Sequence, residues 1–233
     1  MLGSVSGRIR SLYLQHFQRD FSQLGETVVV RRLLKAFPER NFVEIGANDG
    51  ITVSTTYGLA LEGWSGLCVE ANPRMYEKLR RNLAAFPKVK TLCCAASPAT
   101  GPVKLFLGKN DPKGLLSTIS TEDSEWYREN RDTEFVEVPG LPLTEILAQN
   151  HAPKRLALLV VDTEGMDLDI LRTLDLSHYR PRLIVTEDDT AYFGRNGAYK
   201  PKDELKFALL ESAGYGFRQR VGCNSFWLDT NVA

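Results

Sequence analysis

Short apolar runs alternate with amphipathic segments along most of the chain. Runs rich in Val, Ile and Leu predict buried strands, and segments with apolar residues every three or four positions predict helices. Strands are expected at 41–45, 66–70, 89–95, 103–107, 134–138, 156–161, 183–187, 215–221 and 225–228, and helices at 26–37, 52–61, 73–85, 122–131, 166–174 and 202–213. This alternation predicts a mostly parallel sheet with helices on both faces.

The pattern also suggests how the chain is divided. Residues 1–38 are interpreted as an N-terminal helical extension and residues 39–233 as one α/β domain. Between about 97 and 150 the alternation loosens, which is typical of an insertion that carries the substrate side of a site. The last two predicted strands lie close enough to pair near Gly222, so a Rossmann-like, seven-stranded sheet with an antiparallel last strand is expected.

Composition narrows the possible partners. The 29 basic and 29 acidic side chains cancel, so a nucleic-acid partner is not expected. No apolar run approaches the roughly 18 residues of a membrane helix, which predicts a cytoplasmic protein without a membrane partner. The four cysteines have no metal-binding spacing and are interpreted as buried thiols. The expected partner is a small-molecule or glycan acceptor, and a helix at about 9–17 would suit a homodimer contact.

The sharpest motif is Glu44-Ile45-Gly46-Ala47-Asn48-Asp49-Gly50, where a strand gives way to a helix. A dinucleotide fingerprint would have the spacing GxGxxG, but Asn48 replaces its second glycine and the last glycine comes one residue early. The acidic Glu44 suits a ligand with an ammonium group, such as the methionine part of S-adenosylmethionine, either by direct contact or through a water molecule. Replacing Gly46 with Val is expected to block this ligand while the chain still folds.

A second motif, Cys68-Val69-Glu70-Ala71-Asn72-Pro73, ends the next strand. Glu70 follows Gly46 at close to the roughly 20-residue spacing at which a carboxylate binds ribose hydroxyls. The two motifs together predict the following cofactor contacts: Glu44, Gly46, Ala47, Asn48, Asp49, Gly50, Thr52, Glu70, Ala71, Asn72, Ala95, Ser117, Asp162 and Thr163.

With these motifs, the sequence resembles the FkbM family of methyltransferases. The resemblance also rests on residues 22–26, on Gly63-Trp64-Ser65-Gly66 and on the run from Val161 to Asp167, and it spans about residues 22–187. It implies the class I methyltransferase fold and S-adenosylmethionine as cofactor. It further implies methylation of a hydroxyl oxygen on a sugar or another secondary metabolite, without naming the acceptor.

The third motif, Asp162-Thr163-Glu164-Gly165, follows an apolar strand at the edge where the cofactor's methyl group should point. Asp162, Glu164 and, after the next strand, Glu187 are candidate bases for an alcohol proton. Asp162 or Thr163 would alternatively cap the following helix. Asp162, Glu187 and Asp188 offer the oxygen ligands that suit Mg²⁺, although loop carboxylates facing solvent or an arginine are the simpler interpretation.

Two further features complete the expectations. His178 is the best imidazole base if the carboxylates are not used, and the aromatic and basic stretch at 191–197 suits a loop over the acceptor. Two other functions remain open, a nicotinamide-dependent oxidoreductase and a non-catalytic module that keeps the fold.

Overall fold

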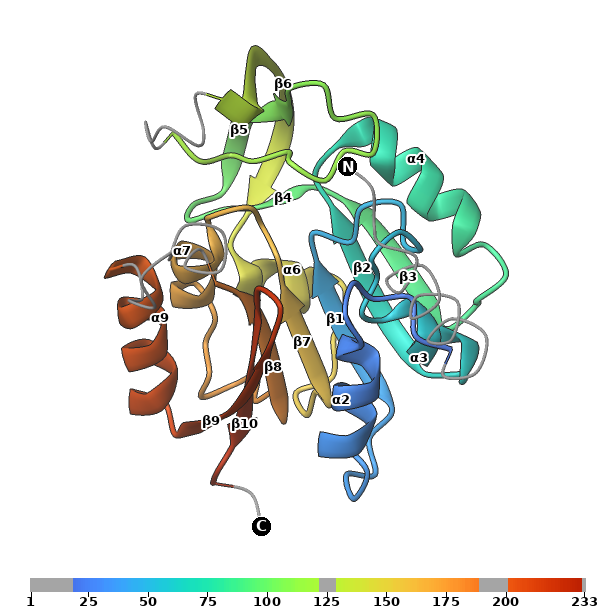
Figure 1. Ribbon diagram of the computed structural model, residues 1–233, viewed down its shortest axis with the longest axis vertical. Helices are drawn as coiled ribbons and strands as arrows, with labels where there is room; N and C mark the ends of the chain where they lie inside the picture. Colours follow the sequence, from blue (N-terminus) through green and yellow to red (C-terminus); the bar gives the residue numbers. More distant parts are fainter. Residues whose placement is uncertain (1–18, 122–128, 189–200, 232–233) are drawn as a thin grey trace.

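The computed structural model describes residues 19–121, 129–188 and 201–231 (Figure 1). Its main sheet has seven strands in the order β3-β2-β1-β7-β8-β10-β9. Their bounds are β1 (Asn41–Ile45), β2 (Ser65–Glu70), β3 (Val89–Cys93), β7 (Leu158–Val161), β8 (Leu183–Glu187), β9 (Tyr215–Val221) and β10 (Asn224–Asp229). From β3 to β8 every pair is parallel, and β10 runs antiparallel to both β8 and β9. The predicted sheet with its antiparallel last strand is confirmed.

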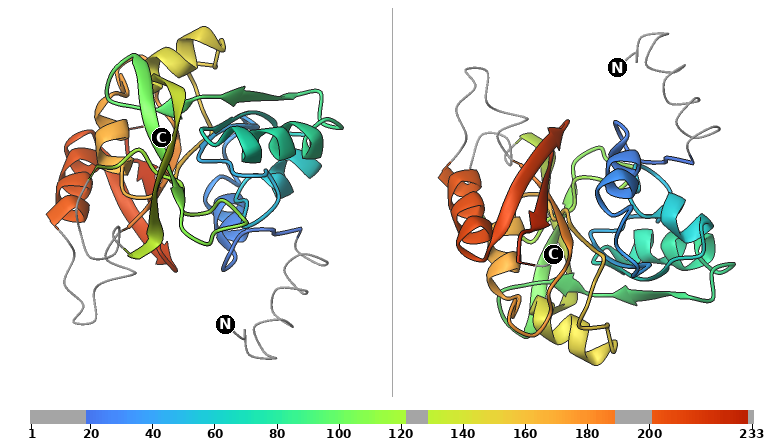
Figure 2. Two further views of the ribbon diagram at one scale, coloured as in Figure 1. Left: turned by 90° about the horizontal axis from the view of Figure 1, so that it is seen from above. Right: turned by 90° about the horizontal axis from the view of Figure 1, so that it is seen from below.

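Helices cover both faces of this sheet, as predicted (Figures 1 and 2). One face packs on α2 (Glu26–Leu33), α3 (Tyr57–Leu61) and α4 (Pro73–Asn82), and the other packs on α6 (Leu143–Gln149), α7 (Asp167–Arg172) and α9 (Pro201–Ser212). Along β1, Phe42 joins the first core, whereas Val43 and Ile45 join the second. Strands buried on both sides need apolar residues at successive positions, which explains why they were visible as apolar runs.

A smaller sheet lies at the carboxyl edge of the main one (Figure 1). It has the order β4-β6-β5, with β4 (Ala95–Ala96), β5 (Gly101–Gly108) and β6 (Arg131–Leu141). The expectation of one strand over 89–95 is corrected, because β3 ends at Cys93 and the next two-residue strand pairs with β6. The region that looked irregular in sequence thus contains an antiparallel pair of strands, β5 and β6.

Two helix predictions need correction. The helix expected over 52–61 begins only at Tyr57, because Val53 has φ of 56° and residues 53 and 54 form bridges with Ser22 and Phe21. The short helix α6 was not predicted, although Leu143, Ile146 and Leu147 follow helical spacing and are buried. The helix expected over 122–131 lies mostly outside the described residues, and β6 begins at Arg131.

The N-terminal region is described only from residue 19, so the helix expected at 9–17 lies outside the described residues. Within the predicted extension, Val29 and Val30 of α2 pack into the core of the main domain. None of the helices described has the length and apolar character needed to cross a bilayer. All four cysteines are free thiols, and Cys68, Cys94 and Cys223 are buried.

Candidate functional site

A cavity of about 230 Å³ opens where β1, β2, β7 and β8 end. Its walls come from the turn after β1, the ends of β2, β7 and β8, the loop 114–119, residues 23–26 and the β9–β10 turn. The carboxyl ends of parallel strands are the usual place for ligands in open α/β sheets. All three sequence motifs contribute to this one cavity.

The first motif forms a tight bend at Gly46, which has φ of 86°. The N–H groups of Gly46 and Ala47 both donate to the carbonyl oxygen of Val69 at 3.0 Å, which ties the bend to the end of β2. A Cβ at residue 46 would lie 1.8 Å from the backbone oxygen of Asp162. Main chain packs on main chain here, so the expectation that Gly46→Val folds normally and only blocks the ligand is wrong.

The rest of the turn contains both lining and supporting residues. Ala47, Asn48 and Thr52 line the cavity. The Asp49 carboxylate instead accepts hydrogen bonds from the backbone N–H and the hydroxyl of Thr52, at 2.7 and 2.8 Å. Gly50 packs against the side chains of α4. Asp49 and Gly50 do not line the cavity. They support the turn from behind.

Glu70 ends β2, is 6% exposed and lines the cavity. Its Oε1 accepts a hydrogen bond from the Asn72 N–H and its Oε2 one from the Asn48 N–H, both at 2.7 Å. Burial raises the pKa of Glu70 to about 7, and these backbone donors oppose the shift. Asn72 itself caps α4, because its Oδ1 accepts from the Arg74 N–H at 3.0 Å.

A loop over the cavity is held by all three motifs. Asn48 Nδ2 donates to the Gly114 carbonyl at 3.0 Å, and Asn72 Nδ2 donates to Ser117 Oγ at 3.1 Å. Thr118 Oγ1 donates to the main chain of the third motif at 2.9 Å. This part of the predicted insertion therefore contacts the cofactor turn. The predicted cofactor contacts that line the cavity are Gly46, Ala47, Asn48, Thr52, Glu70, Ala71, Ala95, Ser117, Asp162 and Thr163.

Glu44 points away from the cavity, into the face covered by α2 and α3. Its Oε2 accepts a hydrogen bond from Thr56 Oγ1 at 2.7 Å and lies 4.0 Å from Cys68 Sγ. Burial raises the pKa of Glu44 to about 7, and the Thr56 hydroxyl opposes the shift. Because adjacent residues of a strand point to opposite faces, Glu44 lies behind the wall that Ile45 helps to form. Direct contact of Glu44 with a ligand ammonium group, as expected from sequence, does not fit this position.

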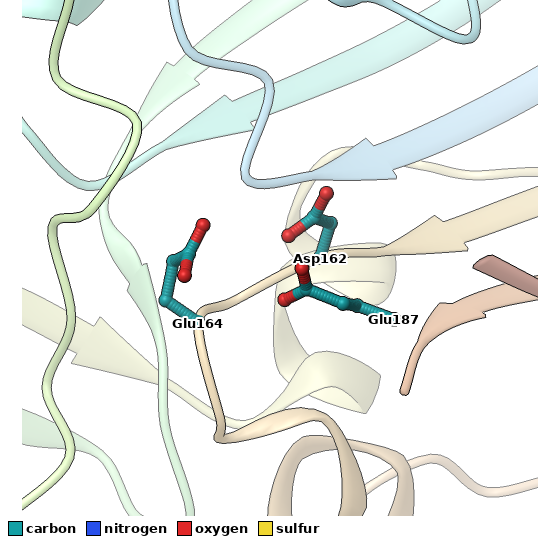
Figure 3. Close-up of side chains that lie close together, drawn as sticks. All are labelled: Asp162, Glu164 and Glu187. Atoms are coloured by element: carbon teal, nitrogen blue, oxygen red, sulfur yellow. The ribbon is translucent and has the colours of Figure 1, made fainter. Parts of the chain in front are cut away.

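Three carboxylates meet at the end of the cavity beside β7 and β8 (Figure 3). Asp162, Glu164 and Glu187 each place an oxygen within 4.8 Å of the others. Burial raises the pKa of Asp162 to about 6. Burial, together with the charges of Asp162 and Glu164, raises the pKa of Glu187. Such crowded carboxylates favour binding a proton or a cation.

Asp188 does not belong to this group, because neighbouring strand residues alternate in direction. Its Oδ1 accepts a hydrogen bond from Ser225 Oγ at 2.8 Å and lies 3.1 Å from Lys206 Nζ. The predicted metal set of Asp162, Glu187 and Asp188 is therefore wrong in its third member. Glu164 holds that position in the structure.

Asp167 and Lys206 fix the ends of β7 and β8 relative to each other. Asp167 Oδ1 accepts hydrogen bonds from the Thr163 N–H and Oγ1, at 2.9 and 2.6 Å, and its Oδ2 accepts from the Glu187 N–H at 2.9 Å. Lys206 Nζ donates to the Glu187 carbonyl and lies 3.4 Å from Asp203 Oδ1. Lys206 is 3% exposed, so a buried cation lies beside the three carboxylates.

The structure separates His178 from the site. It follows α7 on an exposed turn, where its N–H donates to Asp175 Oδ1, and the chain there contacts the segment before β7. That is the opposite edge of the sheet, so His178 as the base is wrong. The stretch 191–197 and Asp189 lie outside the described residues.

Sequence reasoning missed several residues of the site. Gln23, Glu26, Cys223 and Asn224 line the cavity, and Lys206 lies just behind it. Gln23 and Glu26 stood in the segment 22–26 that the family resemblance included, which was the available signal. Nothing in the spacing of Cys223, Asn224 and Lys206 pointed to the cavity, because they reach it through strand pairing and helix packing.

The cavity is acidic. Among the described residues its lining has no Lys, Arg or His and has five carboxylates, Glu26, Glu70, Asp162, Glu164 and Glu187. Such a lining disfavours the pyrophosphate of a nicotinamide dinucleotide, which would need cationic or backbone N–H donors. It suits a ligand with positive charge.

Comparisons with known proteins agree with this geometry. The family model of the methyltransferase FkbM domain matches residues 44–218. The methyltransferase sdnD of Sordaria araneosa is 29% identical over 173 residues, which cover 64% of this chain and 63% of that protein. The match therefore spans less than two thirds of this relative.

Solved structures of other proteins share the fold. A protein assigned as a caffeoyl-CoA O-methyltransferase from Staphylococcus aureus superposes with a TM-score of 0.53 at 10% identity, over 96% of this chain and 91% of that one. The fold is that of class I methyltransferases.

Proposed function

Because this chain belongs to the FkbM methyltransferase family, we propose that it uses S-adenosylmethionine to methylate a hydroxyl oxygen of a sugar, glycan or secondary metabolite. The observation that carries the proposal is the meeting of a ribose-type carboxylate, a glycine bend and three crowded carboxylates in one cavity. A nicotinamide oxidoreductase would lack its phosphate cradle here. A non-catalytic module would have no need of the crowded carboxylates, whose burial is unfavourable.

The cavity fits the cofactor by the chemistry of its donor set. Glu70 offers two carboxylate oxygens, already oriented by the Asn48 and Asn72 N–H groups, to the ribose hydroxyls. The bend at Gly46 places bare main chain at the cavity surface, where a ligand can come close. The five lining carboxylates complement the sulfonium and ammonium charges.

The transfer step assigns a role to the carboxylates beside β7 and β8. S-adenosylmethionine supplies a methyl group whose bond to sulfur breaks, with its electron pair going to sulfur, as the acceptor oxygen bonds to the methyl carbon. Asp162 and Glu187 orient the acceptor hydroxyl, and one of them accepts its proton. The raised pKa of Asp162, about 6, keeps the site close to the point at which a carboxylate takes up a proton near neutral pH.

The same three carboxylates offer a second role as a magnesium site. Their oxygens are hard ligands that lie within 4.8 Å of one another. Two oxygens on one Mg²⁺ ion are at most about 4.2 Å apart, so this role requires the side chains to move closer when the ion binds. A bound ion would lower the pKa of a coordinated hydroxyl in place of direct proton transfer. This role predicts that a chelator abolishes turnover.

The experiment is a transfer screen with methyl-labelled S-adenosylmethionine against free sugars, nucleotide-linked sugars, glycans and polyketide alcohols. Each reaction is run with Mg²⁺ and with EDTA, and labelled products are analysed by NMR. We expect an O-methyl product, formed with EDTA present. Label on nitrogen or carbon would contradict O-methylation, and activity that is lost in EDTA and restored by Mg²⁺ would move the carboxylates to the metal role.

A further inference from the structure

Two segments from opposite ends of the chain close one side of the cavity. Gln23 precedes α2 and Glu26 is its first residue, whereas Cys223 lies in the β9–β10 turn and Asn224 is the first residue of β10. The two segments contact each other, since Cys223 Sγ lies 3.8 Å from Gln23 Oε1. Asn224 pairs with Glu187 across the β8–β10 ladder. This wall therefore lies on the other side of the Gly46 bend from Glu70.

Glu26 is the charged residue of this wall. Its side chain is 1% exposed, and its Oε2 accepts a hydrogen bond from the Leu24 N–H at 2.7 Å. Its Oε1 accepts one from Asn224 Nδ2 at 3.4 Å. Both donors are uncharged, and among the described residues no Lys or Arg forms an ion pair with Glu26. Burying a carboxylate without a counter-charge is costly, so its retention beside a cavity points to a cationic ligand.

The charge of Glu26 faces the same space as the transfer site. It is one of the neighbouring charges that oppose ionisation of Asp162, after the larger effect of burial. Glu44, by contrast, lies behind the cavity wall and is bonded to Thr56. Glu26 thus has the position that sequence reasoning had given to Glu44.

We propose that Glu26, oriented by Asn224, binds the α-ammonium group of the cofactor's methionine end. The inference rests on the proposed use of S-adenosylmethionine. Glu70 and Glu26 then hold the two ends of the ligand, the ribose and the amino-acid group, on either side of the bend at Gly46. The sulfonium between them lies next to Asp162, where the carboxylates are crowded.

Two ligands separate this role from a general effect on the cavity. S-adenosylhomocysteine carries the amino-acid end, and 5′-methylthioadenosine keeps the adenosine and the thioether but lacks that end. Calorimetry on the intact chain compares both ligands for wild type, Glu26→Gln and the matched Glu44→Gln. The Gln side chain keeps the size of Glu and one acceptor oxygen for the Leu24 N–H, while it removes the charge and the second acceptor, which faces Asn224. The comparison of the two ligands separates these changes from a general effect, because both ligands fill the same cavity.

We expect Glu26→Gln to weaken S-adenosylhomocysteine binding by tenfold or more and to change 5′-methylthioadenosine binding by less than twofold. Glu44→Gln should leave both affinities within about twofold of wild type. An independent measurement uses wild type alone: an S-adenosylhomocysteine analogue with hydrogen in place of the amino group should bind at least tenfold more weakly than the parent compound.

Four results would overturn the inference. An equal loss for both ligands in Glu26→Gln would make the effect structural, and full affinity of the deaminated analogue for wild type would leave no partner for Glu26. If Glu26→Gln binds S-adenosylhomocysteine as tightly as wild type does, the role of Glu26 is wrong, whereas the proposed function is unaffected. If wild type binds neither ligand, the proposed function fails and the subsite fails with it.

Discussion

The two sides of the cavity hold their carboxylates in different ways. On the β1–β2 side, Glu70 is fixed by two backbone N–H donors at 2.7 Å. On the β7–β8 side, Asp162, Glu164 and Glu187 have one another as close neighbours, within 4.8 Å. The first side is a rigid acceptor of hydrogen bonds, and the second is a group whose protonation state can change. We infer that Glu70 serves to bind the ribose and that the crowded carboxylates serve in proton transfer.

The residues that hold the carboxylates in place also differ between the two sides. Glu70 is oriented by main-chain groups of the motifs themselves. Glu187 is held through its own main chain, with its N–H bonded to Asp167 and its carbonyl to Lys206. The charge of Lys206 opposes the effect of burial on the pKa of Asp162. Within the described parts of the chain, a buried cation therefore accompanies the crowded side and not the side of Glu70, and it opposes the like charges that disfavour ionisation.

The strongest way to break this comparison is Glu187→Gln. We expect the turnover number to fall by roughly 10²- to 10⁴-fold, the usual contribution of a general base, with S-adenosylhomocysteine affinity unchanged. Because a base acts when deprotonated, wild-type turnover should fall as the pH drops below the raised pKa values, near 6 for Asp162. In the variant, the decrease of turnover at low pH should have its midpoint at a different pH. Glu211→Gln, on the exposed surface of α9, is the control. Reduced affinity of Glu187→Gln for S-adenosylhomocysteine would contradict the separation of binding from proton transfer.

Lys206→Met tests the buried cation. Lys206 is the buried cation beside Asp188 and Asp203, at 3.1 and 3.4 Å, and we expect its removal to lower the free energy of unfolding at pH 7 by about 3–5 kcal/mol. Urea denaturation measures the change. Lys154→Met, at an exposed position, should stay within about 0.5 kcal/mol of wild type. A Lys206→Met chain as stable as wild type would show that the cation does not stabilise the carboxylate side.

Glu70→Ala sharpens the binding side. Loss of the carboxylate should weaken the binding of S-adenosylhomocysteine by about 1–3 kcal/mol, the usual range for charge-assisted hydrogen bonds. Because adenosine contacts are shared, 5′-methylthioadenosine should weaken by a similar factor, unlike the response to Glu26→Gln. Calorimetry measures both, and Glu77→Ala on the exposed face of α4 serves as control. A change in turnover alone, with affinity retained, would count against a ribose contact.

Glu44→Gln should have the smallest effect on ligand binding, because Glu44 lies behind the cavity wall. Its effect is expected on stability. Burial raises the pKa of Glu44 from 4.5 to about 7, so the folded state favours the protonated form. Stability from this group is present below the unfolded pKa and is lost as the pH rises through about 7. The variant should therefore gain about 2–3 kcal/mol relative to wild type between pH 5 and pH 8, measured by urea denaturation. A constant difference across this range would contradict the raised pKa.

The fold was predictable because its signals are local. Strands buried on both faces appear as apolar runs, and β1, β8 and β9 were predicted with the observed bounds. Predictions failed where long-range pairing decides local structure. The two-residue strand β4 exists only because β6 pairs with it, and residues 53 and 54 leave helical geometry because they bridge to Ser22 and Phe21.

By itself the sequence determined the class of the protein and the binding side of its site, because the Gly46 turn and Glu70 are each part of one short run of residues at a strand end. Only the tertiary structure decided which side chains face the cavity. Strand alternation turns Glu44 and Asp188 away from it, and the strand order brings Glu26 and Asn224 to it from the two ends of the chain. Contact between distant segments depends on how strands pair and on which way each side chain points, and neither is written in the spacing of residues.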